Sequence, residues 1–157
     1  FLSHDVRLVV LGSGDKRMED ELGELVRTAP QTFHLCAKLD EPMSHLIEAG
    51  ADFFLMPSVF EPCGLNQMYS QVYGTLPVVS RVGGLVDTVV DVDEDPRNGT
   101  GLMCDPNAAS LRDALQRALI LFADKPRYAG AQQRAMAKDF SWKVAAAGYE
   151  RLYQDSL

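Results

Sequence analysis

A carboxylate beside the start of a predicted helix is the first feature of this sequence that could do chemistry. Glu61 lies in the segment "FEPCGLNQ", and a helical pattern begins at about Gly64. The first N–H groups of a helix lack intrahelical acceptors, and with the helix dipole they form a site suited to a phosphate, to which Asn66 can add a side-chain donor. Glu61 could then accept hydrogen bonds from hydroxyl groups of the same ligand, as in a sugar diphosphate. The alternative is that Glu61 is only a charge partner of the helix N-terminus.

Two glycine-containing turns follow predicted strands and should reach the same edge of a parallel sheet. In "LGSGD", Gly12 and Gly14 permit a tight turn and a close backbone approach to a ligand. The third glycine of the dinucleotide fingerprint is absent, so an ordinary strand-to-helix turn is the alternative. In "SRVGGLVDTV", Gly83 and Gly84 also permit close approach, and Arg81 can pair either with a phosphate or with an acid at the sheet edge.

The composition argues against several classes of protein. The 157-residue chain is 46% apolar, which is typical of a globular domain, and its net charge of −7 argues against a nucleic-acid surface. The longest apolar run is far too short to span a membrane. The cysteines are odd in number and widely spaced, at Cys36, Cys63 and Cys104, and no Cys/His spacing fits a zinc site. We interpret them as reduced thiols in a cytosol-like compartment.

Short strands and amphipathic helices alternate along the chain. Apolar runs rich in Val, Leu and Phe, which are typical of strands buried on both faces, begin at Val6, Phe33, Phe53, Leu76 and Gly101. Apolar residues at helical spacing predict helices around residues 22–26, 43–47, 65–73, 111–122 and from 141 onward. This alternation predicts an α/β fold with a doubly wound, mostly parallel sheet.

Capping and loop signals refine this prediction. Gly50 and Gly74 are expected to end the second and third helices, and Asn107 is expected to begin the fourth. The link "GGLVDTVVDVDEDPRNGT" between the fourth and fifth strands is expected to begin with a short helix or strand. The acidic segment "DVDEDPRNG" that follows is predicted to be a solvated loop, because its spacing does not match a calcium loop.

The segment from Pro57 to Asp91, "PSVFEPCGLNQMYSQVYGTLPVVSRVGGLVDTVVD", resembles the signature of bacterial glycogen synthases and plant starch synthases. The likeness also includes "LVVLGSGD", "DEPMSHLIEAGAD", "NGTGLMCDP" and "AMAKDFSWKVAAAGYERLY", so it extends along nearly the whole chain. In the wider group of GT-B glycosyltransferases a second glutamate usually lies eight residues after the first. Tyr69 occupies that position here, which is typical of the synthase branch.

The resemblance implies a Rossmann-like fold and identifies residues 1–157 as the C-terminal, nucleotide-sugar-binding domain of a GT-B enzyme, truncated at its N-terminus and without the acceptor domain. A strand that precedes Phe1 in the family would lie between the first and third strands, so a gap or shifted pairing is expected there. The terminal helix crosses back to the absent domain in the family, so its apolar stripe is expected to be exposed here. The implied activity is retaining transfer of glucose from ADP-glucose to the non-reducing end of an α-1,4-glucan, without a metal or cofactor.

The resemblance also implies roles for individual residues. Glu61 matches the glutamate that contacts the donor glucose and is the expected catalytic residue. The expected ADP-glucose-binding residues combine the turn and helix start with the glycine turns described above: Cys63, Gly64, Leu65, Asn66, Gly12, Gly14, Gly83 and Gly84.

The expected partners are ADP-glucose, an α-glucan and the missing N-terminal domain, with no nucleic acid and no membrane. The expected compartment is the cytoplasm of a bacterium or the plastid of a plant. Two alternatives stay open: another GT-B glycosyltransferase that uses a UDP- or GDP-sugar, and a non-catalytic nucleotide-binding or interaction module. Because the acceptor domain is absent, the chain alone is expected to be inactive.

Overall fold

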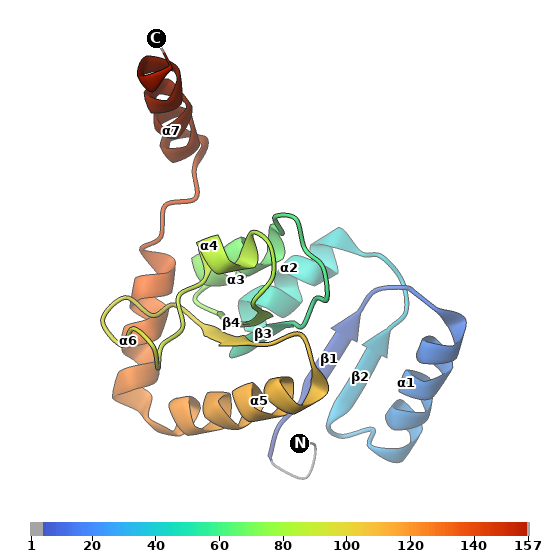
Figure 1. The fold of residues 1–157 in the computed structure, drawn as a ribbon. Coiled ribbons are helices and arrows are strands. Elements are labelled where there is room, and N and C mark those ends of the chain that lie inside the picture. Colours follow the sequence, from blue (N-terminus) through green and yellow to red (C-terminus); the bar gives the residue numbers. More distant parts are fainter. Residues whose placement is uncertain (1–4, 157) are drawn as a thin grey trace. The chain divides into compact units, whose positions relative to one another are not determined.

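The computed structural model describes residues 5–156, and the chain divides into two compact units, Phe1–Ala51 and Asp52–Leu157. The first unit contains β1 (Leu8–Leu11), α1 (Lys16–Thr28), β2 (Phe33–Cys36) and α2 (Glu41–Gly50). The second contains β3 (Phe53–Met56), α3 (Asn66–Tyr73), β4 (Leu76–Ser80), α4 (Leu85–Thr88), β5 (Leu102–Cys104), α5 (Ala108–Ala123), α6 (Lys125–Met136) and α7 (Trp142–Asp155) (Figure 1). All the predicted strands are present, and the α/β class is confirmed.

In the first unit, β1 pairs in parallel with β2, as predicted, with Val9 opposite His34. The helices α1 and α2 begin after Asp15 and Asp40, whose carboxylates accept hydrogen bonds from N–H groups of the first turn. Such caps satisfy donors that the helix itself leaves unpaired. Gly50 is the last residue of α2 rather than its cap, so the predicted end of this helix is wrong by one residue.

In the second unit, the strands form a parallel sheet in the order β3-β4-β5, separate from the β1-β2 sheet. The strands therefore form two sheets, with the interruption between the first and third strands that the resemblance led us to expect. The middle strand, β4, is buried at every position. A strand with a neighbour on each side and cover on both faces has no exposed position, which explains why "LPVVS" does not alternate.

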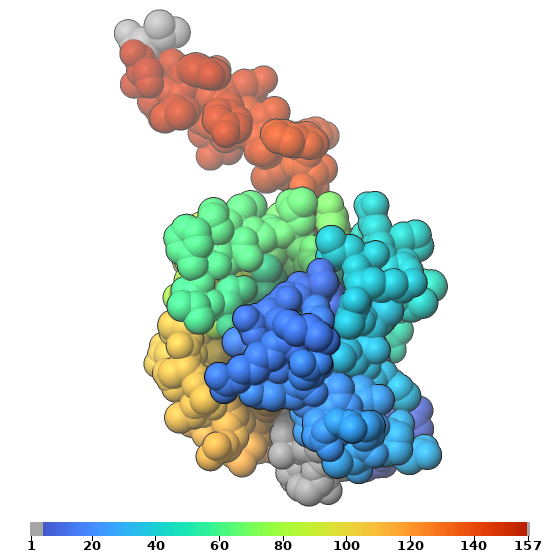
Figure 2. All heavy atoms as spheres, turned by 90° about the vertical axis from the view of Figure 1, so that its right-hand side faces the viewer, coloured from blue at the N-terminus to red at the C-terminus, as the bar shows by residue number. Residues whose placement is uncertain are grey.

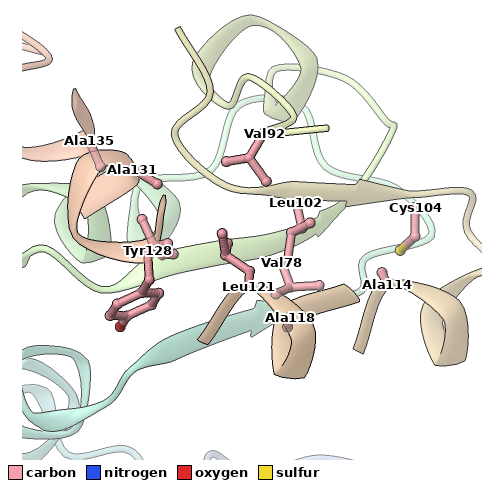
Figure 3. Close-up of a cluster of buried hydrophobic side chains, with 11 residues drawn as sticks. Val78, Val92, Leu102, Cys104, Ala114, Ala118, Leu121, Tyr128, Ala131 and Ala135 are labelled. Atoms are coloured by element: carbon pink, nitrogen blue, oxygen red, sulfur yellow. The ribbon is translucent and has the colours of Figure 1, made fainter. Parts of the chain in front are cut away.

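The core of the second unit lies on both faces of its sheet. Successive residues of a strand point to opposite faces. On one face, β4 residues join a cluster with β5, α5 and α6 that includes Leu76, Val78, Leu102, Leu121 and Tyr128 (Figure 3). On the other face, a smaller cluster contains Val79, Leu85, Val89 and Met103. This second cluster packs the short helix α4, which the sequence left open as helix or strand, against the sheet.

The helix α6 was not predicted. It begins after Asp124, whose carboxylate accepts a hydrogen bond from the N–H of Arg127, and it has a proline in its first turn. Its buried face consists of Tyr128, Ala131 and Ala135. Two of these residues are alanines, so the apolar stripe is weak in the sequence even though the face is fully packed.

The terminal helix α7 begins after Ser141, as predicted. Every described residue of this helix is exposed, and its side chains stand uncovered in the space-filling view (Figure 2). The exposed residues include Trp142, Tyr149 and Tyr153. Across residues 5–156, no helix combines the length and the apolar character needed to cross a membrane.

The acidic segment after α4 is a loop, as predicted, and most of residues 93–98 are exposed, but its first carboxylate is not solvated. Asp91 is buried, accepts a hydrogen bond of 2.7 Å from the N–H of Met103 and pairs with Arg117 of α5. Asp93 pairs with both Arg117 and Arg127. Partial burial raises the pKa of Asp93, but hydrogen bonds from the two arginines outweigh it and leave that pKa lowered. The segment is thus fastened to α5 and α6.

Candidate active site

The turn between β3 and α3 forms the predicted helix start. Gly64 has a φ of +75°, a left-handed conformation that favours glycine. A Cβ at this position would lie 2.5 Å from Oε1 of Gln67 and 3.1 Å from Cε of Met56. Leu65 occupies the N-cap position, and no side chain caps the helix. Glycine is therefore required where the chain turns sharply into α3.

The first N–H groups at this helix start have no acceptor within residues 5–156. Among residues 5–156, the N–H groups of Gly64, Leu65, Asn66 and Gln67 donate to no acceptor, whereas the next, Met68, bonds to the carbonyl of Leu65 at 2.9 Å. Leu65 and Asn66 are exposed. Unpaired donors at the positive end of a helix dipole favour an anion, and a phosphate fits them well.

Glu61 is half-buried, and its carboxylate forms no hydrogen bond or ion pair within the described part of the chain. A carboxylate that served only the helix N-terminus would be expected to accept a hydrogen bond from the first turn, as Asp15 does at α1. The free carboxylate favours contact with a ligand, and that contact stays a prediction.

Gly83 and Gly84 pack directly against the Glu61 turn. Gly83 has a φ of +46°, and a Cβ there would lie 1.8 Å from the carbonyl oxygen of Glu61. A Cβ on Gly84 would lie 2.8 Å from Cα of Cys63, and the N–H of Gly84 donates to the carbonyl of Pro62 at 3.2 Å. These glycines were predicted to let the backbone approach a ligand. The close approach found here is to the Glu61 turn, and their contact with a ligand stays a prediction.

Sequence reasoning missed two polar residues that join these turns. Gln67 is fully buried, with Nε2 at 3.1 Å from the carbonyl of Cys63, 3.0 Å from that of Gly64 and 3.1 Å from Oγ1 of Thr88. The Thr88 hydroxyl donates to the carbonyl of Gly84 at 3.0 Å. The available signal was an amide in the first turn of the helix, from which a side chain can reach back to the turn that precedes the helix.

The structure places Gly12 and Gly14 in the first unit, in the turn after β1. Gly12 has a φ of +148°, and its N–H donates to the carbonyl of Cys36 at 3.0 Å. The N–H of Gly14 donates to Oε1 of Glu19 at 3.0 Å. The remaining predicted site residues lie together in the second unit: Glu61, Cys63, Gly64, Leu65, Asn66, Gly83 and Gly84. Ligand contact at Gly12 and Gly14 stays a prediction.

Comparison with known proteins identifies the family to which this site belongs. Residues 2–120 match the family described as glycosyl transferases group 1. This chain belongs to the group 1 glycosyl transferases. Glycogen synthase from Opitutus terrae is 68% identical to it over 157 residues, which are 100% of this chain and 33% of that protein. Glycogen synthase from Aeromonas hydrophila is 49% identical over 159 residues, again 100% of this chain and 33% of that protein.

A solved structure agrees with these matches. The catalytic domain of starch synthase IV from Arabidopsis thaliana, bound to ADP and acarbose, superposes with a TM-score of 0.83 at 32% identity, covering 96% of this chain and 32% of that one. The predicted resemblance to glycogen and starch synthases is confirmed. This group 1 glycosyl transferase spans about a third of the length of the curated relatives that it matches.

Arg81 of this glycosyl transferase pairs with an acid, one of the two partners left open by the sequence. Its Nη2 forms an ion pair with Glu94, and Nη1 lies 3.8 Å from the sulfur of Met103. The ion pair ties the residue after β4 to the acidic segment on the other side of α4. Arg81 therefore links the start of the loop that contains Gly83 and Gly84 to the acidic segment.

The cysteines occupy different environments. Cys63, in the candidate site, is exposed; Cys36 is half-buried; and Cys104 is buried, which raises the pKa of its thiol. None of them forms a disulfide. In the part of the chain that the structure describes, no group of three His, Cys, Asp or Glu side chains is arranged to hold a metal ion.

Proposed function

We propose that this chain is the donor-binding part of a glycogen or starch synthase, which transfers glucose from ADP-glucose to the non-reducing end of an α-1,4-glucan with retention of configuration. The observation that carries this proposal is the 68% identity to a glycogen synthase over the whole chain. The likeness to a starch synthase domain bound to ADP supports the nucleotide. The full-length protein that contains the chain is called the parent protein below.

The geometry of the second unit suits this reaction. Glucosyl transfer builds negative charge on the departing diphosphate and positive charge on the sugar ring. The unpaired N–H groups from Gly64 to Gln67 would stabilise the diphosphate, because they are already oriented before the reaction begins. Glu61, whose carboxylate has no partner within residues 5–156, would orient the hydroxyl groups of the glucose and stabilise the positive charge.

The remaining assignments belong to the same proposal. Cys63, Leu65 and Asn66 would surround the sugar and diphosphate at the start of α3, and the acceptor glucan would be bound with the help of the rest of the parent protein. Both relatives named above are bacterial, so the cytoplasm is the compartment that we propose. A plastid would replace it in a plant.

The test is an assay of the purified parent protein with glycogen and radiolabelled ADP-glucose, UDP-glucose or GDP-glucose. We expect label to enter the glucan from ADP-glucose, and β-amylase, which releases α-1,4-linked units from non-reducing ends, to release it again. A clear preference for another nucleotide sugar would favour a different glycosyltransferase. Binding of ADP without any transfer would favour a non-catalytic nucleotide-binding module.

A further inference from the structure

The side chain of Gln67 bonds backward onto the turn that contains Glu61. It is fully buried, and its Nε2 lies within hydrogen-bond distance of the carbonyls of Cys63 and Gly64 and of the hydroxyl of Thr88. Its main-chain carbonyl is also bonded, because it accepts from Nε2 of Gln71 at 3.0 Å. A single amide thus joins the start of α3 to the end of α4.

Thr88 extends this connection to the second glycine turn. Its hydroxyl accepts from Gln67 and donates to the carbonyl of Gly84 at 3.0 Å. The N–H of Gly84 donates in turn to the carbonyl of Pro62, next to Glu61. The two turns are therefore held together by a closed path of hydrogen bonds, and Glu61 lies beside that path.

The two ends of the Gln67 amide differ in their hydrogen bonding. Oε1 of Gln67 is buried and has no hydrogen-bond partner among the described residues, and an unpaired buried acceptor destabilises the folded state. A methionine would fill similar space without the unpaired acceptor, but it would leave the carbonyls of Cys63 and Gly64 without the donor at Nε2. The amide fixes the distance between the carbonyls of the Glu61 turn and Thr88, which a methionine would not do.

We propose that Gln67 and Thr88 form a positioning pair, which holds the Glu61 turn and the Gly83–Gly84 turn in the alignment that places the Glu61 carboxylate relative to the N–H groups at the start of α3. Neither side chain needs to touch the substrate. The effect of this pair on turnover rests on the proposed function. The alignment of the two turns can be measured without any substrate.

The chain offers a matched control at the other end of the same helix. Nε2 of Gln132 donates to the carbonyl of Gly74, the C-cap of α3, at 2.8 Å and lies 3.3 Å from the Tyr128 hydroxyl. Gln132→Met therefore removes comparable hydrogen bonds at the C-terminal end of α3, whereas the Glu61 turn lies before its N-terminal end. Gln67→Met and Thr88→Val remove those of the proposed pair, and Thr88→Ser retains the hydroxyl.

The first measurement is hydrogen exchange in the parent protein. We expect Gln67→Met and Thr88→Val to speed exchange in the peptide containing the Gly84 amide by about two- to tenfold, the factor that one hydrogen bond of ordinary strength supports. Thr88→Ser and Gln132→Met should leave this exchange unchanged. Unchanged exchange in both Gln67→Met and Thr88→Val, or equal acceleration in Gln132→Met, would overturn the pair. Should Gln67→Met not fold, the two Thr88 variants decide the matter.

The second measurement is steady-state turnover with ADP-glucose and glycogen. We expect kcat to fall on the order of 10²-fold in Gln67→Met, because small displacements of catalytic groups cost this much. In a Glu61→Ala background the same substitution should have little further effect on kcat, since it acts through Glu61. Full additivity of the two losses would overturn this role. If the wild-type parent protein transferred no glucose, the proposed function would fail, while the exchange measurement would still decide whether the pair aligns the turns.

Discussion

At the scale of single residues, the turn before α3 contains two different groups that the proposed function assigns to a sugar diphosphate. The N–H groups from Gly64 to Gln67 belong to the backbone, so they remain when any side chain is truncated. The Glu61 carboxylate is a side-chain group with no partner within residues 5–156. Substitution of Glu61 can therefore separate the two contributions.

We expect Glu61→Ala in the parent protein to lower kcat by about 10²–10³-fold, the typical effect of removing a preorganised electrostatic partner. The affinity for ADP should change little, because the glucose develops charge only in the transition state and the backbone donors stay in place. Steady-state kinetics and ADP titration measure both quantities.

A suitable control for this experiment is Glu41→Ala. Glu41 lies in the first turn of α2, where an acid interacts favourably with the helix dipole. Its loss should cost about 0.3–1 kcal/mol of stability and leave kcat normal. If Glu61→Ala behaved in the same way, with a lower melting temperature and normal turnover, Glu61 would be only a charge partner of its helix.

Gly83 supplies a second prediction at this scale. Gly83→Ala should destabilise the second unit by about 1–3 kcal/mol, because its φ of +46° is unfavourable for alanine and the new Cβ would overlap the carbonyl of Glu61. Gly23→Ala, in the interior of α1 with nothing within 4 Å of its Cβ, should instead stabilise its helix by about 0.5–1 kcal/mol. Denaturant unfolding of both variants measures the difference, and equal stability changes would contradict the packing of the two turns.

At the scale of elements, the ion pairs of Asp93 join the acidic segment to α5 and α6. The lowered pKa of Asp93 means that its pairs stabilise the folded state at pH values above about 4, the unfolded value for aspartate. This contribution is lost as the pH falls through the lower pKa of the folded state. Because Asp93 is partly exposed, the contribution should be modest, about 0.5–1 kcal/mol.

We therefore expect Asp93→Asn to lower the melting temperature at pH 7 and to have a shrinking effect toward pH 2, as the wild-type carboxylate itself takes up a proton. Asp113→Asn is the control, since Asp113 is exposed on the same helix α5 and forms no ion pair within residues 5–156. Thermal melts from pH 7 to pH 2 test this. A difference between Asp93→Asn and wild type that stayed constant over this range would contradict the ion-pair explanation.

The elements that could be predicted are those whose residue types are dictated by local environment. The strands were predictable because burial on both faces requires continuous apolar runs, and α3 was predictable because its stripe ends at Gly74, which has a φ of +81°. By contrast, α6 was missed because alanines make up much of its buried face. The burial of Asp91 and the ion pairs of the acidic segment were missed because the arginines lie elsewhere in the chain, Arg81 after β4 and Arg117 and Arg127 on later helices. Sequence alone does not reveal such distant contacts.

The candidate site was also predictable only where local backbone requirements determine the residue type. Gly64 and the helix start follow from local backbone requirements, and the structure bears out that turn. The sequence suggested a ligand as the reason for Gly83 and Gly84, whereas the structure shows the carbonyl of Glu61 and Cα of Cys63 in the space that their side chains would need. Gln67 and Thr88 were missed because their bond joins elements that become neighbours only in the folded unit.

At the scale of the whole molecule, the chain spans about a third of the length of its curated relatives. Its terminal helix α7 leaves Trp142, Tyr149, Leu152 and Tyr153 exposed. Large apolar side chains gathered on one element often mark a surface that another part of a protein covers. The family resemblance led us to expect that the rest of the parent protein covers this helix.

The last prediction is that the 157-residue chain alone transfers no glucose. Transfer requires the glucan to be held in line with the donor, and such positioning can supply roughly 7–11 kcal/mol of a barrier. The groups proposed for the donor, namely the N–H groups at the start of α3 and the Glu61 carboxylate, both lie in the second unit. Incubation of the chain with radiolabelled ADP-glucose and glycogen should give no label above background, while the parent protein at equal concentration serves as the positive control. Transfer by the chain alone would mean that donor and acceptor are both aligned within these residues.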